Sequence, residues 1–239
     1  TQIDLRFDSD THNLLVNPFT VSSSGVTTAT NNFSFTNHNL NTGDKVQYIS
    51  TSVTEGLVNQ ESYYAFKVDD NNFKLGETYN DVTSNPANII ELTSTGGATG
   101  SKHEFSLVNP PIPVLRDNNL VFGVGHTSLF GYELNIYHDR DYKNKFVSIG
   151  NTDNLQVTGV GTVGVTTNAT VTLNYYSDSP QILYYNIKKT GFISTSDTDV
   201  INHNKIHYLD SDYDGEYSIF NVPPVVGASY TSFSISIPK

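Results

Sequence analysis

The 239-residue chain contains no cysteine, no methionine and no tryptophan. Without cysteine it has neither disulfides nor thiolate metal ligands, so the fold has to be held by packing and hydrogen bonds alone. A primary translation product begins with methionine, so we expect Thr1 to be an internal residue, a processed start or the first ordered residue. The first ten residues also lack the basic and apolar stretches of a signal peptide.

Basic residues are scarce, with 13 Lys and Arg against 24 Asp and Glu. An acidic protein repels phosphate, so we expect no nucleic-acid partner. No apolar run approaches the roughly 18 to 20 residues that span a bilayer, so we also expect no membrane insertion. Charged residues make up only 15% of the chain, and Asn, Ser and Thr are plentiful. Such a neutral-polar surface is typical of extracellular β-rich and viral structural proteins.

Helical periodicity is missing as well, because no long stretch places apolar residues at i, i+3, i+4 and i+7. Short segments of alternating apolar residues occur throughout instead, bounded by Asn, Asp, Gly or Ser. The alternating segments are Ile3-Leu5-Phe7, Phe33-Phe35, Val46-Tyr48, Tyr64-Phe66-Val68, Phe73-Leu75, Leu134-Ile136, Val171-Leu173-Tyr175 and Phe233-Ile235-Ile237. The sequence therefore predicts an all-β fold.

Two hairpins and one edge strand can be placed along the chain. The turn residues 69–72 (DDNN) lie between two alternating runs, and Asp214-Gly215 is a second strong turn signal. Asp and Asn tolerate the positive φ that tight hairpin turns require. The segment Gly159–Gly164 alternates glycine with valine and threonine, which predicts an edge strand or a bulge.

Prolines mark the clearest boundary, at Pro110, Pro111 and Pro113. Proline donates no ladder hydrogen bond, so we expect an extended connector here. The polar run 194–199 suggests a softer boundary. We predict two or three small antiparallel β-sandwich or barrel-like modules in tandem. They are residues 1–109 with a leading strand, a β-sandwich at 110–195, and a C-terminal β-hairpin region at 196–239.

The sharpest local motif is Asp210-x-Asp212-x-Asp214-Gly215. Alternate carboxylates followed by glycine match the first half of a calcium loop. The bidentate Glu expected at the twelfth position is replaced by Asn221, and the flanking residues have strand character. The alternative is an acidic hairpin turn without a metal. Calcium is thus the one cofactor that the sequence leaves open, and no other cofactor is expected.

The remaining chemical signals do not assemble into an active site. His203 and His207 have a spacing that fits one side of a strand, and no H-E-x-x-H motif is present. His38, between Asn37 and Asn39, is expected to order a loop by hydrogen bonding. No G-x-S-x-G motif and no glycine-rich loop opening a helix occurs. We therefore expect a protein without catalytic activity.

Tyrosine offers a possible binding surface in two adjacent pairs, Tyr175-Tyr176 and Tyr184-Tyr185. Neighbouring residues of a strand point to opposite faces, so at least one ring of each pair is expected at the surface. Exposed Tyr beside Asn and Asp is suited to binding a host-surface glycan. Subunit interfaces are also enriched in tyrosine, so both interpretations stay open.

Part of the chain resembles a repeated β module of large virion structural proteins of tailed phages, particularly phages of marine cyanobacteria. The resemblance covers roughly residues 19–108. It is carried by 33–48 (FSFTNHNLNTGDKVQY), Gly56-Leu57, Tyr63-Tyr64, 68–75 (VDDNNFKL) and His103-Glu104-Phe105. Residues 206–237 look like a partial relative from the same proteins. The resemblance implies a structural part of a tail, baseplate, fibre or neck appendage, without choosing among them.

The middle of the chain resembles a cupredoxin-type β-sandwich found in the same phage proteins, through residues 120–131, 134–137 and Tyr184-Tyr185. Copper-binding members need a Cys and usually a Met beside imidazoles, and this chain has neither. After Tyr185 it reads Asn186-Ile187-Lys188-Lys189 where the ligand loop would follow. The resemblance thus implies a scaffold without its metal.

These resemblances imply that the chain resides in the virion, an extracellular particle. We expect contacts with itself and with other virion proteins, because sheet edges must be covered and closed symmetry covers them. The alternative function is a carbohydrate- or receptor-binding module of a phage fibre or a bacterial surface adhesin.

Overall fold

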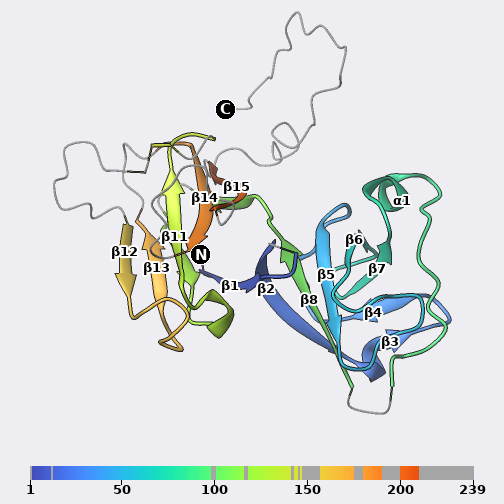
Figure 1. Cartoon of the computed structure of the whole chain (residues 1–239). Helices are drawn as coiled ribbons and strands as arrows, with labels where there is room; N and C mark the ends of the chain where they lie inside the picture. The colour runs from blue at the N-terminus through green and yellow to red at the C-terminus, as the bar shows by residue number, and fades with distance from the viewer. Residues whose placement is uncertain are drawn as a thin grey trace, which may run out of the picture.

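The computed structural model describes residues 2–11, 13–97, 101–115, 118–140, 143–144, 146, 157–174, 180–189 and 200–209. These residues form β-strands connected by turns and a single short α-helix, which confirms the all-β prediction (Figure 1). Within the same ranges, no helix is long and apolar enough to cross a membrane.

Fifteen strands are seen in the described residues. In the first half of the chain they are β1 (Gln2–Asp8), β2 (Asn13–Ser22), β3 (Val26–Thr27), β4 (Asn32–Ser34), β5 (Lys45–Ser50), β6 (Ser62–Lys67), β7 (Asn72–Gly76) and β8 (Lys102–Val108), with helix α1 (Tyr79–Thr83) after β7. In the second half they are β9 (Ile112–Leu115), β10 (Leu120–Gly123), β11 (Tyr132–Tyr137), β12 (Val157–Val160), β13 (Thr170–Leu173), β14 (Ile182–Lys189) and β15 (Val200–Leu209). Two 3₁₀ turns, η1 (Ser23–Gly25) and η2 (Thr127–Leu129), complete the elements.

The strands pair into two sheets. One has the order β12-β13-β10-β1-β2-β8-β5-β6-β7-β4-β3, and the other has the order β11-β14-β15-β9. Most neighbours are antiparallel, but β1 runs parallel to β10, and β15 runs parallel to β9. The two parallel pairs are a departure from the antiparallel modules that the sequence predicts. That the modules are sandwiches or barrels stays a prediction.

The first strand shows how the sequence pattern becomes a sheet. Its apolar residues Ile3, Leu5 and Phe7 are buried, while Gln2 and Asp4 at alternate positions are exposed. Successive side chains of a strand point to opposite faces, so one face of β1 packs inward and the other stays polar. The alternation in the sequence predicts this face correctly.

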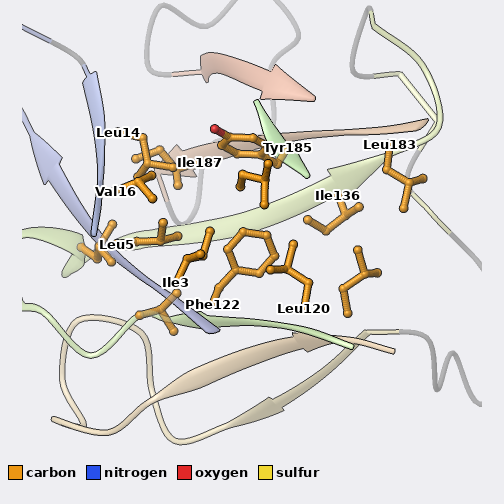
Figure 2. Close-up of a cluster of buried hydrophobic side chains, with 14 of the residues drawn as sticks. Ile3, Leu5, Leu14, Val16, Leu120, Phe122, Ile136, Leu183, Tyr185 and Ile187 are labelled. Atoms are coloured by element: carbon orange, nitrogen blue, oxygen red, sulfur yellow. The ribbon is translucent and has the colours of Figure 1, made fainter. Parts of the chain in front are cut away.

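A first hydrophobic cluster combines strands of both sheets (Figure 2). Phe122 on β10 and Tyr185 on β14 point toward one another across it, with ring centroids 6.3 Å apart. The Tyr185 hydroxyl donates a 2.7 Å hydrogen bond to the Pro110 carbonyl, which satisfies its only polar atom. The buried members are Ile3, Leu5, Phe7, Leu14, Val16, Ile112, Val114, Leu120, Phe122, Val124, Leu129, Ile136, Phe146, Ala169, Leu173, Leu183, Tyr185 and Ile187.

A second cluster lies among β2 to β8 and is rich in aromatic rings. Phe19 of β2 and Phe73 of β7 have ring centroids 5.9 Å apart, although three strands separate β2 from β7 in the sheet. In a flat sheet that separation would be roughly 19 Å, at about 4.8 Å per strand. The large sheet therefore curls around the second cluster, and Phe33 and Phe105 pack against Phe73 inside it.

The hairpin predicted at residues 63–75 is confirmed as the antiparallel pair β6–β7. Its turn differs from the expectation in one respect, because none of residues 69–72 has a positive φ. The Asp69 carboxylate instead accepts hydrogen bonds from the Asn71 amide (2.7 Å) and from the Asn72 side chain (3.0 Å). This Asx-type closure holds the turn without a left-handed residue.

The same hairpin corrects the predicted phase of one strand. Tyr63 and Ala65 are buried in the second cluster, whereas Tyr64 and Phe66 are only half-buried. Alternation fixes the period of a strand but not which of its two faces meets the core. Here the smaller Ala65 fills the inward position, because the surrounding aromatic rings already occupy the space.

Two local predictions concern strands at the edges of the sheets. Pro113 lies inside β9, at one end of the four-stranded sheet, so the extended connector is limited to Pro110 and Pro111. Proline is tolerated there because an edge strand has a side that needs no donor. The edge strand predicted near Gly159 is confirmed as β12, which ends the other sheet, and a turn with positive φ at Gly161 and Gly164 follows it.

The clusters bear on how the chain is divided. Residues 3–16 pack in the first cluster with residues 112–187, and residues 21–105 form the second. β15 (Val200–Leu209) pairs with β14 and β9, so it belongs to the same sheet as they do. The boundaries at 109/110 and 195/196 stay predictions, and the hairpin expected at residues 212–219 lies outside the described residues.

Candidate functional site

The outer face of β1 borders a cavity of about 800 Å³. Because Ile3, Leu5 and Phe7 point into the first cluster, the alternate residues Gln2, Asp4 and Arg6 point away from it and line the cavity. The opposite wall comes from the end of β10, the β10–η2 turn, and the segment 165–170 that leads into β13. We call this hollow, together with the smaller one described next, the β1 groove.

A second hollow of about 320 Å³ shares Gln2, Asp4 and Pro18 with the first. Its other walls are two half-buried rings, Phe19 and Phe35, whose centroids lie 4.7 Å apart. Exposed amide side chains surround these rings, at Asn17, Asn37 and Asn39. The second hollow thus adds an apolar surface and neutral hydrogen-bonding groups to the polar first hollow.

Gly123, the last residue of β10, and Gly125 just beyond it allow the groove to form beside Asp4. Gly123 is paired in register with Asp4, and a Cβ at Gly123 would overlap the Asp4 carboxylate. A Cβ at Gly125 would likewise overlap the Thr167 carbonyl. The absence of side chains at these positions lets the carboxylate lie close over the β10 backbone.

The charges in the groove are unevenly matched. Arg6 forms a 2.6 Å ion pair with Glu104, and both side chains are about 30% exposed or less. Asp4 is exposed, and among the described residues its carboxylate has a single long contact, of 3.4 Å with the Gln2 side-chain amide. Its backbone amide donates to the Asn17 side chain at 3.0 Å, which fixes the strand but not the carboxylate. Asp4 is therefore the carboxylate that the groove offers to a ligand.

His126 completes the first hollow as a neutral ring. Burial, and secondarily the charge of Arg6, lowers its pKa below 6.5. Nδ1 accepts a hydrogen bond from the Ser128 amide at 3.2 Å, so the ring proton resides on Nε2. At neutral pH His126 thus supplies a hydrogen-bond donor without a charge.

The other described histidines have structural contacts. His38 Nδ1 accepts from the Leu40 amide at 3.0 Å, and Nε2 donates to the Asp69 carbonyl at 2.9 Å. Both ring nitrogens tie the 37–40 loop to the β6–β7 turn, which confirms the predicted role of His38. His203 and His207 both lie on β15, which is paired with β14 and β9, but their side chains lie outside the described residues.

The predicted tyrosine site is only partly described. Tyr185 is fully buried in the first cluster, whereas Tyr184 is half-buried on the opposite face of β14, where it is paired in register with Tyr137. Of this pair, only Tyr184 reaches the surface, as the alternation of a strand predicts. Tyr185 is excluded as a glycan or interface contact, because its ring has no exposed face. Tyr175 and Tyr176 lie outside the described residues.

The predicted calcium ligands are likewise not described. Asp210, Asp212 and Asp214 lie outside the described residues, so calcium binding there stays a prediction. In the described ranges, no group of three or more His, Asp or Glu side chains is placed to hold a metal ion. Asn186, which follows Tyr185 in the cupredoxin-like segment, is buried and paired in register with Asn135.

Sequence reasoning missed the β1 groove. The polar residues Gln2, Asp4 and Arg6 alternate visibly with the apolar ones, and glycines occur at 123 and 125. These signals are ordinary for a strand and a turn, and only the parallel pairing of β1 with β10 brings them together.

Comparisons with protein families, with curated proteins and with solved structures find no match to this chain.

Proposed function

We propose that the chain is a non-catalytic structural module of a phage virion, forming part of a tail, baseplate, fibre or neck appendage. The resemblance of residues 19–108 to virion modules supports the location. The structural role draws its support from the way in which the backbone connects the two hydrophobic clusters.

The observation that carries this proposal is the position of β1 in the large sheet. β1 is hydrogen-bonded to β10 on one side and to β2 on the other. β2 then continues into the second cluster and pairs with β8. A continuous series of paired strands therefore links both clusters, with one register shift between Val16 and Phe19 of β2. A module that holds a fixed geometry within a particle needs such a connection.

The polar interior is consistent with a scaffold. His38 and His103 each use both ring nitrogens to hold loops, so neither presents a free base to a substrate. Tyr48 and Tyr185 likewise direct their hydroxyls to protein atoms. These side chains act as supports within the fold.

The experiment that tests the virion proposal examines the particle itself. Mass spectrometry of gradient-purified particles should detect this chain in stoichiometric amount, and cryo-EM should place its two-cluster density in the tail, baseplate, fibre or neck. Absence of the chain from purified particles would contradict the proposal. A reproducible polysaccharide hydrolysis, lost on replacing a single Asp or Glu, would contradict its non-catalytic part.

A carbohydrate- or receptor-binding module is the second candidate. The β1 groove favours it, because the groove combines exposed hydrogen-bonding groups with a half-buried aromatic surface. The two candidates are compatible, since a structural protein at a particle surface can also bind a host molecule.

A further inference from the structure

We propose that the β1 groove is a binding site for an uncharged oligosaccharide, with Asp4 as its principal hydrogen-bond acceptor and the Phe35 ring as its apolar platform. This inference names the site and the ligand class of the second candidate function and rests on that candidate. It is independent of the virion proposal and of the tyrosine pairs.

The size of the groove suits a ligand of a few sugar rings. Its two hollows, of about 800 and 320 Å³, lie within or near the range of roughly 300 to 1,000 Å³ seen for small-molecule sites. Gln2, Asp4 and Pro18 line both hollows, so a ligand that lies across these three residues would contact both. A sugar ring bound over Asp4 would then be linked to a further ring in each hollow.

The charge of the groove argues against an anionic ligand. Its Arg6 is already paired with Glu104 at 2.6 Å, and partial desolvation together with the Arg6 charge lowers the pKa of His126, which disfavours its cationic form. Asp4 remains as an exposed carboxylate, in a chain whose net charge is −11. Phosphate, sulfate or uronate groups would therefore meet repulsion.

The remaining groups match the hydroxyls of a neutral sugar. A carboxylate accepts two hydrogen bonds from adjacent hydroxyls, and hydrogen bonds to a charged group are the stronger kind. The His126 ring offers Nε2–H as a donor. The Asn17 oxygen is occupied by the Asp4 amide, so its NH₂ group is what Asn17 presents. Donors and acceptors are thus both available without added charge.

The second hollow supplies the apolar contact that sugar rings also require. Phe35 is half-buried and packs against Phe19, at a centroid distance of 4.7 Å. Asn37 and Asn39 flank it, both held at positive φ and both exposed. An aromatic ring supported by a second ring loses little conformational freedom when a ligand covers it.

The test uses the full 239-residue chain on an array of neutral, uronic-acid and amino-sugar oligosaccharides, followed by calorimetric titration of the best neutral probe. We expect neutral probes to bind and uronic-acid probes not to bind. Asp4→Asn should weaken binding about tenfold or more, because a charged acceptor is lost. Asp10→Asn is the matched control, since it changes the net charge equally at an exposed turn outside the groove, and it should leave affinity unchanged.

Two further variants test the second hollow. Asn39→Gly removes an amide while glycine keeps the positive φ of 56°. Phe35→Leu keeps an apolar side chain but removes the flat ring. We expect each to weaken binding severalfold, with melting temperatures confirming that the variants are folded. A loss in Asp4→Asn alone would restrict the ligand to the first hollow and overturn the platform role of Phe35.

Three results would overturn the inference as a whole. One is an absence of binding to every neutral probe, and another is equal affinity of Asp4→Asn and Asp10→Asn for the best probe. The third is binding confined to amino-sugars that weakens steeply with added salt, which would mark Asp4 as a site for cations. None of these results bears on whether the chain is present in particles, so the two proposals fail separately.

Discussion

The Tyr48 hydroxyl donates a 2.8 Å hydrogen bond to Nδ1 of His103, joining β5 to β8 in the interior of the second cluster. The Thr54 amide donates to the same hydroxyl at 3.1 Å, and His103 Nε2 donates to the Thr95 carbonyl at 3.0 Å. The pair thus attaches two loops, around residues 54 and 95, to the sheet. All of these polar atoms are satisfied by one another, so removing one leaves others without a partner.

Replacing Tyr48 by Phe should therefore destabilise the protein by about 1 to 3 kcal/mol, because the Thr54 amide and His103 Nδ1 lose their partner in a buried site. Urea unfolding measures the change in free energy. Tyr64→Phe is the matched control, because Tyr64 is half-buried on the outer face of β6 and its ring packs against Tyr79. Equal losses in the two variants would contradict the role assigned to the Tyr48 hydroxyl.

The same network predicts how stability depends on pH. Burial lowers the pKa of His103 below the ordinary value of 6.5, so the unfolded chain takes up a proton at higher pH than the folded chain does. The stabilisation is fully present above about pH 6.5 and is lost as the pH falls toward the folded pKa. Urea unfolding at several pH values should show this decline, and His103→Asn should reduce its slope.

Two other described groups also have shifted pKa values, but they do not obscure the comparison of the two pH slopes. Burial also lowers the pKa of His126, with the same sign of effect, and burial raises the pKa of Asp44, with the opposite sign. Both are present in the His103→Asn variant, so the difference in slope belongs to His103. An unchanged slope in the variant would contradict the prediction.

Two glycines allow the stability cost of backbone strain to be compared with the cost of a steric overlap. Gly131 has φ +84° with open space around its missing Cβ, so Gly131→Ala should cost about 1 to 2 kcal/mol from backbone strain alone. Gly56 has φ +103°, and a Cβ there would overlap the Glu91 carbonyl. We expect Gly56→Ala to cost about 3 kcal/mol or more, measured by urea unfolding. Equal losses of unfolding free energy in the two variants would contradict this expectation, because the 54–57 turn would then accommodate the added Cβ at no further cost.

The shared packing of β1 leads to a prediction about fragments. Residues 110–239 lack Ile3, Leu5, Phe7, Leu14 and Val16, which belong to the first cluster. We expect this fragment not to fold alone and to gain dispersed NMR amide signals when residues 1–109 are added. Residues 1–109 keep every member of the second cluster and should fold by themselves. A well-folded 110–239 fragment would instead support the boundary at the prolines.

Assembly is the last prediction. We expect the chain to form a homo-oligomer or to attach to other virion proteins, through tyrosine-rich strand faces and sheet edges, because uncovered edges invite further pairing. Cryo-EM of the particle is the measurement, since an isolated chain can be monomeric outside it. A chain tethered only at one terminus, with its tyrosine-rich faces in solvent, would contradict the prediction.

Parts of the fold follow from the sequence because they depend on neighbouring residues. The alternation of Ile3, Leu5 and Phe7 predicts the buried face of β1, and the Asp69–Asn72 run predicts the β6–β7 turn. The sequence-based prediction fails where distant residues decide which face of a strand points inward. Nothing in residues 62–67 shows that Ala65 points inward while Tyr64 points outward, because the aromatic rings that decide it come from β2, β4, β7 and β8.

The candidate site depends on distant residues in the same way. The sequence by itself determined the all-β character, the polar face of β1 and the loop-ordering role of His38, since each rests on residue chemistry and short-range periodicity. Only the tertiary structure decided that β1 runs parallel to β10, which places Asp4 over Gly123 and Phe35 nearby. A parallel pair needs a long crossover connection, and its partners leave no mark in the local pattern of either strand.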